Sequence, residues 1–118
     1  RTTVDGLADA LVAAIDPATT LLVASSDLSH FHEAATAHAL DARVAECVRT
    51  FDPDRLQALL EARPEHACGG GPMVAVMKAA QRLGATNAVV LEYADSGDVS
   101  GDKQSVVGYL AAVIGSAA

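Results

Sequence analysis

The chain has few of the residues that many binding surfaces require. Aromatic residues make up only 3% of its 118 positions and tryptophan is absent, so a surface that stacks single-stranded bases is not expected. Eight Lys and Arg residues stand against fifteen Asp and Glu residues, which gives a formal net charge of −7. Because phosphate backbones are bound chiefly by Lys and Arg, we expect no nucleic-acid partner. The acidity suits solubility and affinity for a cation.

Cysteine and long apolar runs are also scarce. The two cysteines, Cys47 and Cys68, are too few for a disulfide scaffold, and we find no secretory signal and no apolar run of about 18 residues. We therefore expect a protein of the reducing cytoplasm that does not bind membranes. The length of 118 residues predicts one domain over residues 1–118, and the start at Arg1 is compatible with a fragment.

Apolar residues recur at three- and four-residue intervals in four segments, which predicts four helices. Asp5 is expected to cap the first, and Asp52 followed by Pro53 marks the start of the third. Gly84 is expected to end the fourth in a left-handed conformation. The predicted helices are 5–15, 33–50, 53 to the residue before Pro64, and 73–83.

Three short apolar runs predict strands near residues 20–25, 88–91 and 106–114. Such runs are typical of strands that are buried on both faces of a parallel sheet. Helices that alternate with these strands indicate an α/β fold with a layered, mostly parallel sheet flanked by helices. The segment 95–103 is rich in Gly, Asp and Ser and is expected to be a loop.

A polar run, residues 25–30, follows the first predicted strand directly. In open α/β sheets, ligands bind just beyond the carboxyl ends of the strands. Asp27 and His30 are three positions apart and can face the same way, as metal ligands or as an acid–base pair. The alternative is that Asp27 or Ser29 caps the following helix. His38, in the middle of that helix, is expected on the surface.

Cys68 is followed by three glycines and Pro72, at the start of the fourth predicted helix. The positive end of the helix dipole favours the thiolate, the form that binds metals and attacks electrophiles. The alternative is a small buried cysteine beside a glycine turn. A second polar segment, 93–102, carries three aspartates, which suit either a divalent cation or a solvated turn.

These segments together resemble the Memo family, also known as the B component of the AmmeMemoRadiSam system. The resemblance runs from about residue 4 to residue 113, and its motifs occur in the family's order. The matching stretches are Ser25-Ser26-Asp27-Leu28-Ser29-His30-Phe31, Asp41, Cys68-Gly69 before Pro72, Tyr93-Ala94-Asp95-Ser96-Gly97-Asp98-Val99-Ser100-Gly101-Asp102, and Val106-Val107-Gly108-Tyr109.

The resemblance implies a fold like the later half of the class III extradiol dioxygenases, with a metal-type cleft. Asp27, His30 and Cys68 match part of the family's cleft, and His30 and Cys68 would be the metal ligands. Iron or copper, with redox or oxygen chemistry, is implied as the cofactor. Two further histidines belong to the early half of the family's sequence and have no counterpart here.

Two functions are therefore weighed. One is a metal-dependent, dioxygenase-like redox protein that is incomplete in this chain alone. The other is a non-catalytic module that binds an unidentified peptide or small molecule in the same cleft without metal. A serine hydrolase that uses Ser26 or Ser29 is disfavoured, because neither serine lies in a Gly-x-Ser-x-Gly motif. Half of a sheet leaves an unpaired edge, so we expect a homo-oligomer or a missing N-terminal half as partner.

Overall fold

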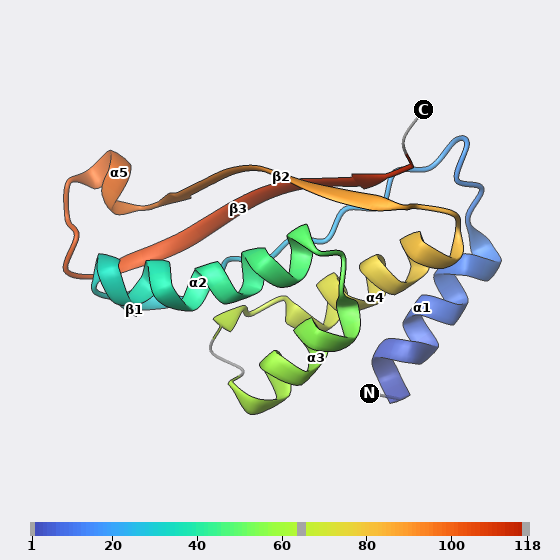
Figure 1. Cartoon of the computed structure of the whole chain (residues 1–118), viewed down its shortest axis with the longest axis horizontal. Coiled ribbons are helices and arrows are strands. Elements are labelled where there is room, and N and C mark those ends of the chain that lie inside the picture. The colour runs from blue at the N-terminus through green and yellow to red at the C-terminus, as the bar shows by residue number, and fades with distance from the viewer. Residues whose placement is uncertain (1, 64–65, 117–118) are drawn as a thin grey trace.

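A computed structural model describes residues 2–63 and 66–116 of the chain. Five helices and three strands follow one another along these residues (Figure 1). The elements are α1 (Thr2–Ala14), β1 (His30–His32), α2 (Ala34–Arg49), α3 (Pro53–Ala62), α4 (Gly70–Arg82), β2 (Asn87–Asp95), α5 (Gly97–Ser100) and β3 (Val106–Gly115). None of the helices in these two ranges is long and apolar enough to cross a membrane.

The four predicted helices are confirmed, with changes at their ends. Asp52 caps α3, because its carboxylate accepts a hydrogen bond from the backbone N–H of Arg55 (3.0 Å). Asp5 does not cap α1: that helix begins at Thr2, and the Asp5 carboxylate instead accepts from Lys78 Nζ (2.6 Å). Gly84 has the expected positive φ, 103°. Pro64, expected to end α3, lies outside the described residues.

The sheet is antiparallel, so the prediction of a mostly parallel sheet is wrong. Its strand order is β1-β3-β2, and β2 pairs with β3 from Asn87 opposite Gly115 to Asp95 opposite Gly108. The reason is the short connection, residues 96–105, since a parallel pair needs a crossover of about a dozen residues or more. Part of that connection forms α5, although the segment 95–103 was expected to be a loop throughout.

The predicted strand at 20–25 does not belong to a sheet. Within the described part of the chain, residues 20–24 make no backbone-to-backbone hydrogen bond. A strand needs a neighbour for its N–H and C=O groups, and this segment pairs with none of the described strands. This segment therefore leaves an open edge.

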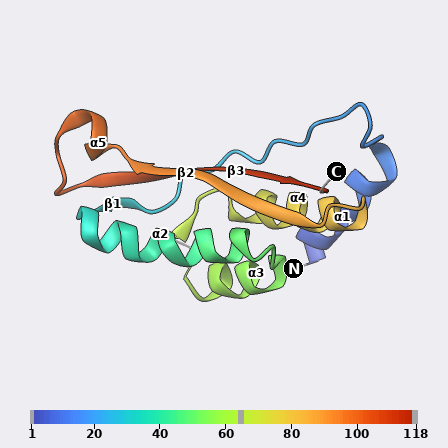
Figure 2. The same cartoon turned by 45° about the horizontal axis from the view of Figure 1, so that its top comes forward.

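The core lies on one face of the β2–β3 ribbon. Figures 1 and 2 show α2, α3 and α4 on the same side of the ribbon. The opposite face carries exposed apolar side chains, at Val89, Leu91, Tyr109 and Val113. The buried core residues are Leu28, Val44, Cys47, Val48, Leu56, Ala67, Val74, Met77 and Ala88.

Candidate functional site

The start of α4 contacts the polar run directly. The backbone N–H of Gly69 donates to Ser26 Oγ (2.7 Å). Cys68 Sγ lies 3.7 Å from Ser26 Oγ and 3.8 Å from the backbone oxygen of Asp27. The Cys68 thiol is free and exposed, whereas Cys47 is a buried core residue. The alternative of a buried Cys68 is therefore wrong.

Gly69 permits this contact because it has no side chain. A Cβ at this position would lie 2.6 Å from the backbone oxygen of Ser25 and 2.6 Å from the Cβ of Ser26. Both distances are far shorter than a normal contact, so any larger residue would separate α4 from the polar run. The Cys68-Gly69 pair thus holds the thiol beside Asp27.

Asp27 and His30 face each other, as their spacing predicted. The Asp27 carboxylate lies 3.6 Å from His30 Nε2, and both side chains are partly exposed. Phe31, the next residue in the sequence, has a positive φ of 62°. Its side chain is exposed, and the centroid of its ring lies 5.7 Å from the centroid of the His30 ring. Neither Asp27 nor Ser29 caps α2, because Glu33 does so by accepting from the backbone N–H of Ala35.

The three predicted site residues therefore lie on one continuous surface. Cys68 contacts the backbone of Asp27, whose carboxylate faces His30. In residues 2–63 and 66–116, however, no three His, Cys, Asp or Glu side chains come close enough together to hold a metal ion. Chemically, this surface offers a thiol, an imidazole and a carboxylate from one side of a site.

A buried carboxylate supports this surface from behind. Asp41, fully buried on α2, accepts hydrogen bonds from the backbone N–H of Ser29 (2.9 Å) and from the Tyr93 hydroxyl (2.5 Å). Burial, together with the hydrogen bond to Asp41, raises the pKa of Tyr93, so the hydroxyl stays a donor. The resemblance included Asp41, but no role was predicted for it. Its place on the inward face of α2, between Ala37 and Val44, was the available signal.

The aspartate-rich segment is buried at Asp95 and exposed from Asp98 to Asp102. Asp95 is buried and accepts from His38 Nε2 (2.6 Å) and Lys103 Nζ (3.0 Å). Lys103 Nζ also donates to Asp98 (2.6 Å), so an ammonium group occupies the position of a cation. The hydrogen bond from His38, followed by that from Lys103, lowers the pKa of Asp95 from 3.8 to about 2. His38 is half exposed, as expected, but it also anchors this carboxylate.

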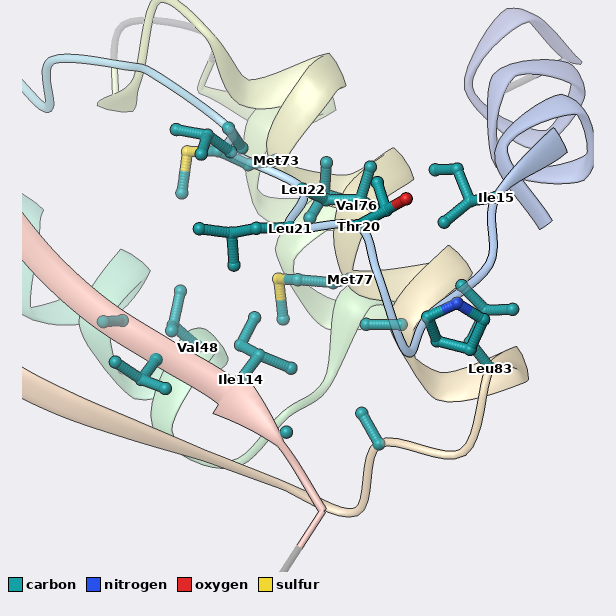
Figure 3. Close-up of a pocket in the computed structure, with 18 of the residues that line it drawn as sticks. Ile15, Thr20, Leu21, Leu22, Val48, Met73, Val76, Met77, Leu83 and Ile114 are labelled. Carbon is teal, nitrogen blue, oxygen red and sulfur yellow. The ribbon is translucent and has the colours of Figure 1, made fainter.

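An apolar pocket of about 550 Å³ adjoins the polar surface. Figure 3 shows Leu21 and Leu22 from the unpaired segment, Met77 from α4 and Ile114 from β3 around it. Ser26 lines the pocket and also contacts Cys68, so the two features share a border. This pocket was not predicted from the sequence, because residues 20–25 were expected to form a strand inside a sheet.

Comparisons with known proteins agree on one family. The family model described as "Memo-like protein" matches residues 1–113. A MEMO1 family protein of Methanosarcina mazei is 40% identical over 94 residues, which are 80% of this chain and 35% of that protein. One of Nitrosopumilus maritimus is 42% identical over 90 residues, 76% of this chain and 33% of that protein. The chain spans about a third of the length of these curated relatives.

Proposed function

Because the chain belongs to the Memo-like family, we propose that it supplies one wall of a metal-type cleft in which Cys68 and His30 bind iron or copper. The observation that carries the proposal is the contact of the Cys68 thiol with the backbone of Asp27, whose carboxylate faces His30. Residues 41 positions apart in the sequence are thereby joined at one accessible surface.

The donor types suit the proposed metals. Thiolate and imidazole are ligands that iron and copper accept, and both side chains are accessible. Cys68 lies just before α4, where the positive end of the helix dipole stabilises a negative charge. Both cysteines are free thiols, which suits the reducing cytoplasm that we propose as the location.

Asp27 would act through His30. A carboxylate beside a ligating histidine orients the ring and fixes which nitrogen carries the proton. The same pair can hold or transfer a proton next to the thiol. A bound iron or copper ion would supply the redox or dioxygenase-like chemistry itself.

This wall alone is a partial site. The described residues contain no group of three side chains that could hold a metal, and a stable site needs further ligands. The relatives are about three times as long as the matched segment, and the family resemblance puts two further histidines in the early half. We propose that metal binds tightly only when that half completes the cleft.

The second candidate is a binding module that works without metal. Two observations favour it: the incomplete ligand set, and the uncharged pocket that borders Ser26 beside Cys68. In this function the thiol surface would form the polar end of a site for an apolar peptide or small molecule. Binding of that partner would survive a chelator.

The test is metal content, measured by mass spectrometry on anaerobically purified protein. We would compare the chain alone with a chimera in which it replaces the matching third of the Methanosarcina mazei relative. We expect near-stoichiometric iron or copper in the chimera and at least a tenfold loss in Cys68→Ala and in His30→Ala. His32→Ala, on the same short strand, and Cys47→Ala, the other thiol, are the matched controls and should retain metal.

Two results would contradict the metal function. One is metal that persists in Cys68→Ala and His30→Ala. The other is a chimera without metal under conditions in which the relative itself holds it, which would favour the binding module.

A further inference from the structure

A groove runs between the unpaired segment and the sheet. We call residues 20–24 the edge segment. It forms one wall of the apolar pocket, β3 forms the other, and α4 forms the floor (Figure 3). No charged residue lines the pocket within the described part of the chain. The groove therefore suits an uncharged, apolar occupant.

The β3 wall of the groove is a free strand edge. β1 pairs with β3 only at Val106 and Val107, and two further backbone hydrogen bonds join Gly108 to Leu28 and Ser29. From residue 109 to residue 115, the edge of β3 that faces away from β2 has no strand partner among the described residues. Backbone N–H and C=O groups on such an edge can pair with another strand.

The opposite wall is equally unpaired. None of the backbone groups of the edge segment takes part in a backbone-to-backbone hydrogen bond within the described part of the chain. Leu21 is 85% exposed and Val23 is 76% exposed, whereas Leu22 and Ala24 between them are partly buried. This alternation is the two-residue period of a strand.

We propose that this groove receives an apolar β-strand from the part of a Memo-like protein that this chain does not span. Two open edges above an apolar floor form the geometry of β-strand addition, in which main-chain hydrogen bonds bind the guest strand. The relatives extend well beyond the matched third, so they contain further chain from which such a strand can come. The proposal stands independently of metal binding.

Leu21 and Val99 provide a matched pair for the test. Both are exposed apolar side chains, at 85% and 95%, but only Leu21 lines the groove, whereas Val99 lies on α5. In the isolated chain, Leu21→Asp and Val99→Asp should each change the Tm by less than about 2 °C. In the chimera described above, Leu21→Asp should lower the Tm by about 8 °C or more, since it would bury an unpaired charge. Val99→Asp should leave the Tm of the chimera nearly unchanged.

Hydrogen exchange provides the second readout. The amides of residues 110–114 that face the groove should exchange at least about a hundredfold more slowly in the chimera than in the isolated chain. Equal Tm losses for the two variants, or equal exchange rates in the two proteins, would overturn the proposal. So would a chimera that fails to fold where the relative folds.

Other occupants of the groove would give distinct results. Slow exchange in an isolated chain that light scattering shows to be a dimer would identify a second copy as the occupant. Slow exchange in an isolated monomer would mean that the edge segment itself closes onto β3. Either result overturns the proposal. Loss of metal from a chimera that passes both tests would contradict only the proposed function.

Discussion

The two ends of β3 differ in how far the rest of the chain covers them. At the first end, Gly108 lies against the buried carboxylate of Asp41, and β1 pairs with the neighbouring residues. At the other end, from Leu110 to Ile114, the strand borders an open apolar pocket. One strand thus passes from an enclosed polar region to an uncovered apolar region.

The difference reflects the physics of the two kinds of burial. A buried charge is stable only where partners hold it at fixed positions, so Asp41 and Asp95 have their donors within this chain. Apolar burial is non-directional, so any surface of suitable shape can cover the open end. The chain therefore supports the Asp27–His30 surface by itself and leaves its apolar half uncovered.

The largest expected effect comes from the same substitution, glycine to alanine, made at each end of β3. In Gly108→Ala the new Cβ would lie 1.9 Å from an oxygen of Asp41, whereas in Gly115→Ala no atom would come within 4 Å of it. We expect Gly108→Ala to lower the free energy of unfolding by about 3 kcal/mol and Gly115→Ala to leave it nearly unchanged. Urea unfolding measures both. Equal effects would mean that the two ends are packed alike.

The next effect concerns acid stability at the polar end. The folded state lowers the pKa of Asp95 from 3.8 to about 2, so its ionised form adds stability that is present above pH 3.8 and is lost as the pH falls toward 2. Asp95→Asn should therefore make the free energy of unfolding less dependent on pH in this window. His38→Gln removes the largest cause of the shift, so the folded-state pKa of Asp95 should rise toward 3.8 and the loss of stability should be smaller and complete at a higher pH.

Urea unfolding at closely spaced pH values would follow this change. Parallel curves for the wild type and Asp95→Asn would show that the bonds from His38 and Lys103 do not shift the titration of Asp95.

The smallest effect tests the uncovered face of the ribbon. Val89 is half exposed on the outer face, whereas its neighbour Val90 packs against the core. We expect Val90→Thr to cost about 1 kcal/mol or more, because it buries a hydroxyl, and Val89→Thr to change stability by less than about 0.5 kcal/mol. Chemical denaturation at two protein concentrations measures both. A comparable, concentration-dependent cost at Val89 would indicate that a second copy covers this face, as in the proposed homo-oligomer.

Local signals predicted the helices better than the sheet. Spacing of apolar residues and the Asp52-Pro53 pair located the helices, because both report interactions within a few residues. The direction of β2 and β3 was predicted wrongly, since a buried apolar run reads the same in parallel and antiparallel sheets. The shortness of residues 96–105 was the available clue to a hairpin-like return.

The sequence selected the candidate site residues but not the residues that support them. Asp27 and His30 are near in sequence, and Cys68 was identified by its glycines, so chemistry and local geometry were enough to select them. Asp41 received no role, because its importance depends on Tyr93 and Gly108, which lie more than 50 positions away. No local pattern encodes a contact of that kind.

The sequence by itself determined the helices, the acidic character, the family and the residues that can bear chemistry at residues 27–30 and 68. These properties follow from composition, short-range spacing and motif order. Only the tertiary structure decided the strand directions, the contact of Cys68 with Asp27, the burial of Asp41 and Asp95, and the open groove beside the edge segment. The reason is that these features depend on backbone pairing and close packing between distant segments, which become fixed only when the chain is folded.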